Sequence, residues 1–252
     1  MKNYTLQNRR KSIHIVVFTG GAYPKPEETE NYWKTCAASA PEYVVAADSG
    51  LDVCLEYKNY FAGRYDFSPR RILGDFDSIS SREILSSFPK EIVESFPRDK
   101  DFTDTELALR FSFKEAADEG RKPFITLVGG DGGRLDHLFS IVNTFRTEFH
   151  PDSWLAEKQQ VAFLQPKTGY FLSSLGISDN VSFVSLAGKG RKIFTEGLKW
   201  ESGLFADGFV PSVSNRISEE NFSSEKPVFI KPKASGFLLI FPFSAHISFS
   251  DS

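Results

Sequence analysis

The first 150 residues alternate short apolar runs with longer segments of helical character, and this alternation constrains the fold more than any other feature of the sequence. Several of the runs are continuously apolar, as is typical of strands that are covered on both faces. Strands that alternate with helices favour a parallel sheet, so we expect a doubly wound, mainly parallel α/β domain over residues 13–150. The predicted strands are Ile13–Thr19, Tyr43–Ala47, Arg71–Leu73, Ile92–Phe96 and Phe124–Val128.

One helix is well marked in this half of the chain, and a second is predicted after it. Thr103 followed by Glu106 is a capping box, and Gly120 is a typical helix stop, so a helix is predicted between them. A second helix is predicted from Leu135, where apolar residues recur at steps of three and four. We expect this apolar stripe to face the core, and its members are Leu135, Leu138, Val142, Phe145 and Phe149.

Beyond residue 150 the pattern changes. Residues 151–160 begin with a proline followed by mostly polar side chains, which predicts a linker between domains. Residues 161–252 hold short strand-like runs with no helical periodicity, and this indicates an antiparallel β domain, a sandwich or a barrel. Those runs are Val161–Leu164, Tyr170–Leu172, Val181–Leu186, Val228–Ile230, Phe237–Phe241 and His246–Phe249. Residues 1–12 are polar and basic and are expected to form a flexible tail.

The net charge, the apolar runs and the two cysteines indicate which classes of protein this chain is unlike. A net charge of -3 disfavours a nucleic-acid partner, because phosphate backbones are bound by a basic excess. No run of about 18 apolar residues exists, so no membrane span is expected. Cys36 and Cys54 lack the spacing of a metal site, which favours free thiols in a reducing compartment. A cytoplasmic protein is therefore the expectation.

Acidic clusters follow the predicted strands of the first half. Asp48 follows the second strand, Asp75 and Asp77 follow the third, and Asp101 and Asp104 follow the fourth. The carboxyl ends of parallel strands share one edge of a sheet, so these side chains are expected to converge. Carboxylates this close need a counter-charge, and together with water they suit Mg²⁺ that is shared with substrate phosphates.

Each acidic residue taken alone also has an ordinary structural interpretation. An isolated Asp-x-Asp is most often a solvated loop, Asp48 fits a turn, and Asp104 favours the helix dipole. The interpretation as a metal site depends on their joint placement after successive strands.

A glycine-rich loop, Gly129–Arg134, follows the fifth strand. It lacks the Gly-Lys-Ser/Thr ending of a P-loop and the glycine spacing of a dinucleotide-binding fingerprint. Its glycines still permit close approach of the backbone to phosphate, and Arg134 can grip a phosphate bidentately. The competing interpretation of Arg134 is an ion pair with Asp136. Lys100 is a second candidate phosphate contact or a solvated side chain, and His137 fits a structural hydrogen bond better than proton transfer.

Six motifs occur in order along the chain: Ala47–Gly50, Gly74–Ser78, Lys100–Glu106, Gly133–His137, Glu196–Trp200 and Ser212–Asn215. In their order and approximate spacing they resemble the thiamine pyrophosphokinase family, from about Ile13 to Phe249. The chain departs from that family at Ser49, where glycine is usual, and at Asp52, where asparagine is common.

The resemblance implies an N-terminal α/β domain that binds ATP and a C-terminal β-sandwich that binds thiamine, in a homodimer with active sites at the subunit interface. It implies transfer of pyrophosphate from ATP to the thiamine hydroxyl, which gives thiamine diphosphate and AMP. The implied magnesium ligands are Asp75, Asp77 and Asp104, supported by Asp48 and Asp101. The implied ATP contacts are Asp48, Lys100, Thr103, Arg134 and Asp136. The implied thiamine contacts are Trp200, Ser214 and Asn215, and the residues expected to act in catalysis are Asp75, Asp77, Asp104 and Arg134.

Two alternatives stay open at this point. A related magnesium-dependent pyrophosphokinase would share the acidic site but use a different acceptor. A non-catalytic protein that binds thiamine or a nucleotide would bind its ligand without turnover.

Overall fold

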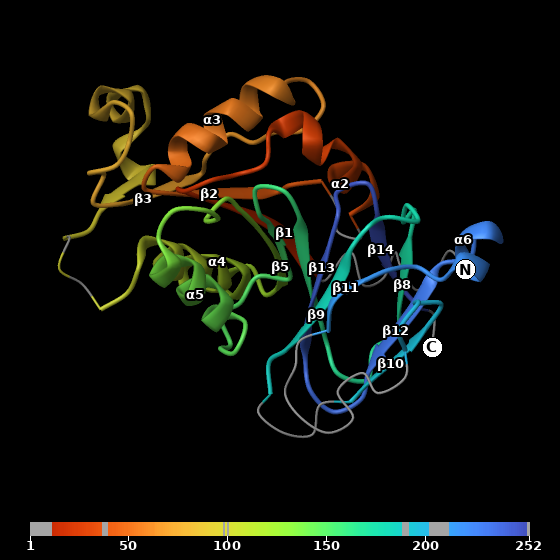
Figure 1. Cartoon of the computed structure of the whole chain (residues 1–252). Coiled ribbons are helices and arrows are strands. Elements are labelled where there is room, and N and C mark those ends of the chain that lie inside the picture. The colour runs from red at the N-terminus through yellow and green to blue at the C-terminus, as the bar shows by residue number, and fades with distance from the viewer. Residues whose placement is uncertain are drawn as a thin grey trace. The chain divides into compact units, whose positions relative to one another are not determined.

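The computed structural model describes residues 12–36, 40–97, 99, 101–187, 192–201 and 212–250. The chain divides into two compact units (Figure 1). The first unit comprises Met1–Glu27 and Ala38–Glu157, and the second comprises Glu28–Ala37 and Lys158–Ser252. None of the helices in the described part of the chain has the length and hydrophobicity that a membrane span requires.

The first unit is built on a parallel sheet with the strand order β6-β5-β1-β2-β3-β4. The central strand β1 is buried from its second residue to its last, as expected for a strand covered on both faces. The predicted parallel α/β sheet is therefore confirmed. Its strands are β1 (Ser12–Thr19), β2 (Tyr43–Ala47), β3 (Arg71–Gly74), β4 (Val93–Ser95), β5 (Lys122–Val128) and β6 (Ser153–Leu155).

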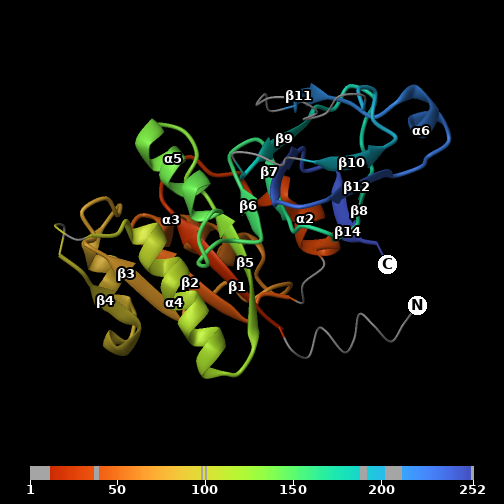
Figure 2. The same ribbon diagram turned by 90° about the horizontal axis from the view of Figure 1, so that it is seen from below.

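Helices cover both faces of this sheet: α3 (Gly50–Tyr60) lies on one face, and α4 (Asp104–Asp118) and α5 (Leu135–Thr144) lie on the other (Figures 1 and 2). Short 3₁₀ helices η2 (Arg82–Ser87) and η3 (Lys90–Ile92) connect β3 to β4. Beneath α3, the fully buried rings of Phe18, Tyr57 and Phe67 pack edge to face with centroids 5.2–5.8 Å apart. Such burial anchors the helix to the strand.

Helix α4 begins as its capping sequence predicts. Thr103 Oγ1 accepts a hydrogen bond from Glu106 N at 3.2 Å, and Thr103 N donates to Glu106 Oε2 at 2.8 Å. Gly120, with φ +66°, follows the end of the helix. The capping box satisfies backbone N–H groups that have no partner within the helix.

The apolar stripe predicted on α5 is only partly buried. Phe145 is 3% exposed, but Leu135 is 68% exposed and the neighbouring Phe139 is 62% exposed. The buried residues of the helix are Ile141 and Thr144, and residues 135–137 of its first turn are exposed. The prediction that Leu135 faces the core was wrong, because periodicity reveals an apolar face but not what covers it.

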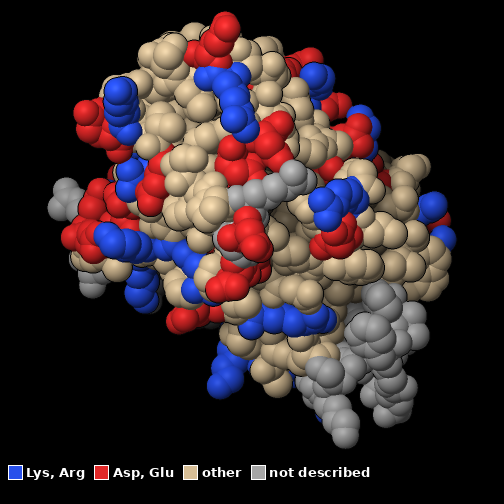
Figure 3. Space-filling view, turned by 90° about the vertical axis from the view of Figure 1, so that its left-hand side faces the viewer, with Lys and Arg blue, Asp and Glu red and all other residues tan. Residues whose placement is uncertain are grey.

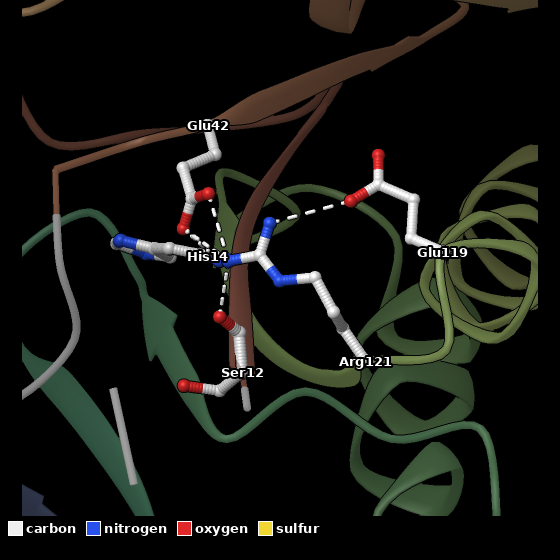
Figure 4. A network of polar contacts seen from close by, with 5 residues as sticks. All are labelled: Ser12, His14, Glu42, Glu119 and Arg121. Atoms are coloured by element: carbon white, nitrogen blue, oxygen red, sulfur yellow. Dashed lines mark hydrogen bonds and ion pairs between the residues drawn. The ribbon is translucent and has the colours of Figure 1, made fainter. Parts of the chain in front are cut away.

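A network of hydrogen bonds and ion pairs stabilises the amino-terminal edge of the same sheet (Figure 4). Arg121 pairs with Glu42 at 2.8 Å and with Glu119 at 3.3 Å, and it also donates to the carbonyl of Ser12. Glu42 in turn accepts from the backbone N–H of His14 at 3.4 Å. The hydrogen bond to Glu42 is the main cause of the raised pKa of Arg121. The network joins the starts of β1 and β2 to the end of α4.

The second unit contains two antiparallel sheets, with strand orders β11-β9-β13-β7 and β10-β12-β8-β14. Strands β9 and β12 alternate buried and half-buried residues, which is the pattern of a sheet with one core face. One hydrophobic core draws on both sheets, so the expected β-sandwich is confirmed. The strands are β7 (Gln160–Leu164), β8 (Tyr170–Ser173), β9 (Val181–Ser185), β10 (Ile193–Glu196), β11 (Ser212–Asn215), β12 (Val228–Pro232), β13 (Phe237–Phe241) and β14 (His246–Phe249).

The expected linker 151–160 is different in the structure. It contains β6, which is buried throughout, and the first residue of β7. The Trp154 indole N–H donates to Gly129 O at 2.7 Å, so this segment is an integral part of the first unit. A strand this short carries too few residues to show a pattern of its own.

Two short helices of the second unit were also not anticipated. Helix α2 (Glu30–Thr35), which follows the 3₁₀ helix η1 (Pro26–Thr29), comes from the N-terminal half of the sequence. Asn31 on α2 donates to Phe243 O at 2.9 Å and to Ser244 O at 3.0 Å, which fixes the helix to the turn before β14. Helix α6 (Glu219–Ser223) is capped by Ser218, whose hydroxyl accepts from Asn221 N.

Candidate active site

A cleft of about 740 Å³ lies where the strands of the first unit end. Acidic side chains gather near the centre of the face on the β3 side of the molecule, with basic side chains around them (Figure 3). Seven of the residues predicted from the sequence line this cleft: Asp48, Asp75, Asp77, Asp101, Thr103, Asp104 and Arg134. The convergence expected from parallel strand ends is thus observed.

Three of the aspartates form a tight group within the cleft. Asp48, Asp75 and Asp77 each offer a carboxylate oxygen, and these oxygens lie within 4.8 Å of one another. Asp101 and Asp104 line the cleft but fall outside this group. Like charges at such separations repel unless a cation or protons intervene.

The backbone that carries Asp48 is unusual. Asp48 has φ +49°, in the left-handed region, and its N–H donates to Leu73 O at 2.8 Å. Gly74 follows on the next strand with φ +152°, and a Cβ on Gly74 would lie 3.1 Å from Asp48 Cα. Glycine at position 74 therefore lets the ends of β2 and β3 approach closely enough to bring Asp48 beside Asp75.

The group fits a hard divalent cation. Oδ1 of Asp48 is buried, and no donor among the described residues hydrogen-bonds to it. A buried carboxylate oxygen without a partner is costly, and a metal ion would satisfy it. The donor set consists of carboxylate oxygens alone, which suits Mg²⁺ or a similar ion. The residues present therefore fit the metal that the sequence predicts.

The loop before α4 brings Asp101, Thr103 and Asp104 to the same cleft. The Thr103 hydroxyl serves the capping box, donating to Glu106 Oε2 at 3.0 Å while accepting from Glu106 N. Thr103 therefore contributes first to the helix start. The amino terminus of α4 opens into the cleft, where the helix dipole favours an anion.

The glycine-rich loop after β5 forms another wall of the cleft. Gly130 N donates to Gly20 O at 2.8 Å, and Ala22 and Asp131 pair through bonds of 2.6 and 3.1 Å. Gly129 has φ +93°, and a Cβ on it would lie 2.4 Å from Thr19 O. Only glycine allows this contact, which holds the loops after β1 and β5 against each other.

Arg134 lies at the cleft, but its guanidinium is paired with Asp136. Arg134 Nε donates to Asp136 Oδ1 at 3.1 Å, and a second bond joins Nη2 to Oδ2. These bonds lower the pKa of Asp136 and raise that of Arg134. The side chains are 71% and 62% exposed, so solvent and salt weaken the pair. The structure therefore contains the predicted ion pair between Arg134 and Asp136, and a bound anion could replace Asp136 as the partner of the guanidinium.

The three residues predicted to contact thiamine belong to the second unit. Trp200 is 52% exposed and Ser214 is exposed, whereas Asn215 is 1% exposed and its amide is hydrogen-bonded to the backbone of Trp200. Lys100 lies outside the described residues.

Several cleft residues were not singled out from the sequence. Thr105 bonds to Thr19 through their hydroxyls at 2.7 Å, and Ser78 Oγ donates to Asp77 Oδ1 at 2.8 Å. Both Thr105 and Ser78 directly follow a predicted aspartate, which was the available signal. Ser140 lines the cleft from α5 without any such signal.

Comparison with known proteins agrees with this arrangement. The sequence profile described as "Thiamin pyrophosphokinase, catalytic domain" matches residues 30–153. A comparison with curated protein sequences finds no match.

Solved structures share the fold over most of the chain. A thiamin pyrophosphokinase family protein from Enterococcus faecalis has a TM-score of 0.63 at 20% identity, covering 91% of this chain and 98% of its own. Thiamin pyrophosphokinase from Candida albicans has a TM-score of 0.62 at 16% identity, with 92% of each chain covered. Thiamine pyrophosphokinase from Bacillus subtilis has a TM-score of 0.60 at 18% identity, covering 92% of this chain and 99% of its own. Residues 30–153 are thus similar to the catalytic domain of thiamin pyrophosphokinases, and the solved structures show that the chain shares their fold.

Proposed function

We propose that this protein transfers the pyrophosphoryl group of ATP to the hydroxyl of thiamine, giving thiamine diphosphate and AMP. The observation that carries the proposal is the convergence of Asp48, Asp75 and Asp77 in one cleft, in a chain that is similar to this family over residues 30–153. In the proposed reaction the thiamine oxygen bonds to the β-phosphorus of ATP. The bond from the β-phosphorus to the oxygen of the α-phosphate breaks, and AMP leaves with that oxygen.

Some residues of the cleft would bind the metal ion, and others would bind the nucleotide. Asp48, Asp75 and Asp77 would hold Mg²⁺, with Asp101 and Asp104 facing the same space. When bound, the ion would neutralise charge on the phosphate oxygens of ATP.

Other groups of the cleft would bind the phosphates directly. The amino terminus of α4 faces the cleft, where its helix dipole would favour an anion, and Arg134 can exchange Asp136 for a phosphate. Lys100 and Thr103 are the remaining candidate phosphate contacts. Asp104 is the candidate acceptor for the proton of the thiamine hydroxyl.

Thiamine would be recognised through Trp200, Ser214 and Asn215 of the second unit. An aromatic ring favours the cationic thiazolium, and the acidic cleft favours it as well. We further propose that the protein acts as a homodimer with its active sites at the subunit interface, in the cytoplasm.

The experiment is a coupled assay of AMP release with Mg²⁺, ATP and a panel of alcohol acceptors. AMP should form with thiamine and not with unrelated alcohols, since equal rates with all acceptors would point to a different pyrophosphokinase. Asp75→Asn and Asp77→Asn should each reduce the rate on the order of 10²-fold or more while the protein stays folded.

The matched control is Asp118→Asn. Asp118 is an exposed aspartate of α4 whose partner is Lys114, four residues earlier on the same helix. This variant should keep the full rate. Ligand binding without AMP release in the unmodified protein would instead identify a non-catalytic binding protein.

A further inference from the structure

The turn that carries the metal-binding pair has an unfavourable backbone conformation. Phe76, between Asp75 and Asp77, has φ +58°, although its large side chain is only 5% exposed. Bulky residues seldom adopt this left-handed region, because Cβ crowds the following carbonyl. Within the turn, Asp77 N donates to Asp75 Oδ1 at 3.2 Å, a bond that depends on a carboxylate which a metal would also engage. Other groups must therefore stabilise the turn.

Arg82 contacts the turn from outside the cleft. This residue begins η2, and its Nε donates to Phe76 O at 2.8 Å while Nη2 lies 3.4 Å from Asp75 O. The guanidinium is planar and rigid, so a donor pair aimed at two successive carbonyls fixes the orientation of the peptide planes between them. Those planes determine the directions in which Asp75 and Asp77 project.

Asp52 holds the other end of the same loop. It lies in the first turn of α3, and its Oδ2 accepts from Ser80 N at 3.0 Å and from Ser80 Oγ at 2.7 Å. Helix α3 begins at Gly50, two residues after Asp48, and Leu51 N donates to Asp48 O at 3.0 Å. One helix start therefore sets the position of Asp48 and, through Asp52, that of the loop bearing Asp77.

We propose that Arg82 and Asp52 are positioning residues that hold Asp75 and Asp77 in the geometry needed to share a divalent cation with Asp48. Neither side chain belongs to the carboxylate group itself, and neither lines the cleft. The inference rests on the metal site of the proposed function, but it concerns metal affinity and not the identity of the acceptor.

The test is a titration of the full chain with Mn²⁺ as the probe ion, followed by the electron paramagnetic resonance signal of free Mn²⁺. Arg82→Met and Asp52→Ala are each expected to weaken Mn²⁺ binding about ten- to a hundredfold, the usual effect of losing a group that orients a ligand. Arg82→Lys keeps a single donor nitrogen, so its affinity for Mn²⁺ should lie between those of Arg82→Met and the unmodified protein. Asp52→Asn keeps an acceptor for Ser80 and should bind Mn²⁺ nearly as well as the unmodified protein.

Arg146→Met provides the matched control, since Arg146 is an exposed arginine that does not line the cleft. Its Mn²⁺ affinity should not change. Thermal unfolding identifies any variant that fails to fold. If Arg82→Met is one of these, the comparison of Arg82→Lys with Asp52→Asn and Asp52→Ala decides the question.

Activity measurements add a second readout. In the positioning variants the Mg²⁺ concentration for half-maximal AMP release should rise, while the rate at saturating Mg²⁺ recovers most of its value. Folded Arg82→Met and Asp52→Ala proteins with unchanged Mn²⁺ affinity would overturn the inference, and so would an unmodified protein that binds no Mn²⁺. An unmodified protein that binds Mn²⁺ through Asp75 but releases no AMP would refute the proposed function and leave this inference standing.

Discussion

Asn215 and Trp200 are joined by a pair of hydrogen bonds. The Asn215 amide donates to Trp200 O at 2.9 Å, and its Oδ1 accepts from Trp200 N at 3.2 Å and from Arg216 N at 2.9 Å. Asn215 is 1% exposed, whereas Trp200 is 52% exposed and has Lys199 Nζ 5.1 Å from its ring centre. A buried amide therefore fixes the backbone of an exposed aromatic residue.

Replacing Asn215 should loosen Trp200. Asn215→Ala leaves the Trp200 N–H and carbonyl without these partners, at a cost of about 1–3 kcal/mol for each group that stays buried. Trp33 and Trp154 are 6% and 5% exposed, so acrylamide quenching of tryptophan fluorescence reports mainly on Trp200. We expect stronger quenching in Asn215→Ala and a higher KM for thiamine, with an unchanged KM for ATP.

Trp200→Phe serves as the control for this prediction, because it should abolish the quenchable signal. Unchanged quenching and an unchanged thiamine KM in folded Asn215→Ala would contradict the positioning role of Asn215.

The exposed ion pair between Arg134 and Asp136 should affect nucleotide binding more than stability. Arg134→Ala removes a charge-assisted contact to phosphate, and kcat/KM for ATP should fall about ten- to a hundredfold. Asp136→Asn removes the competitor for the guanidinium, so KM for ATP should fall at low ionic strength.

Salt provides the check on that competition. The difference in KM between Asp136→Asn and the unmodified protein should vanish at high salt, because the pair is exposed and screened. Steady-state kinetics at two ionic strengths measure it. An Arg134→Ala protein with full activity would show that this guanidinium does not reach ATP.

Asp152 should make the stability of the protein depend on pH. Burial raises the pKa of Asp152 to about 6, opposed by the hydrogen bond from Ile125 N at 2.8 Å and by the charge of His150. The pKa of Asp152 in the folded protein lies above its unfolded value of about 3.9, so the protonated carboxyl contributes its full stabilisation below about pH 4. This stabilisation is lost as the pH rises through about 6. At pH 7 the free energy of unfolding is lower by at most about 3 kcal/mol than it is below pH 4.

Asp152→Asn keeps an oxygen acceptor and removes the charge, so it isolates this effect. Urea unfolding between pH 4 and pH 8 should show the variant more stable than the unmodified protein at neutral pH, with the difference shrinking towards pH 4. A constant difference across this range would contradict the assignment to Asp152.

Arg110 lies between two aromatic rings and should stiffen one wall of the cleft. Its guanidinium carbon is 4.2 Å from the ring centre of Phe102 and 4.5 Å from that of Phe149. Phe102 lines the cleft beside Asp101. Arg110→Met should cost about 1 kcal/mol of stability and speed hydrogen exchange of the amides at 101–103.

Arg110→Lys restores a cation and should recover part of the exchange protection. The same exchange rates in Arg110→Met and the unmodified protein would show that the stacking does not restrain the loop.

Much of the fold and of the candidate site could be predicted from the sequence. Largely apolar runs such as Ile13–Thr19 indicate strands of a parallel sheet, and the observed β1 spans Ser12–Thr19. Once the sheet is parallel, Asp48, Asp75 and Asp77 must approach one edge, since successive strand ends meet there. The capping box at Thr103 is a purely local signal and was equally readable.

The features that could not be predicted depend on partners distant in sequence. In the sequence Arg82 cannot be told from any other surface arginine, because its two carbonyl partners are defined only by the folded turn. Asp52 accepts from Ser80, which is 28 residues away along the chain. The burial of Asn215 likewise depends on Trp200, 15 residues away.

The sequence by itself determined the secondary-structure class of each half and the type of chemistry that the acidic loops can support. Both follow from periodicity and from residues adjacent along the chain. Tertiary structure alone decided which groups orient the carboxylates and which apolar residues of α5 remain exposed. The physical reason is that hydrogen-bond partners and packing neighbours are set by how the elements assemble, and a linear pattern does not carry that information.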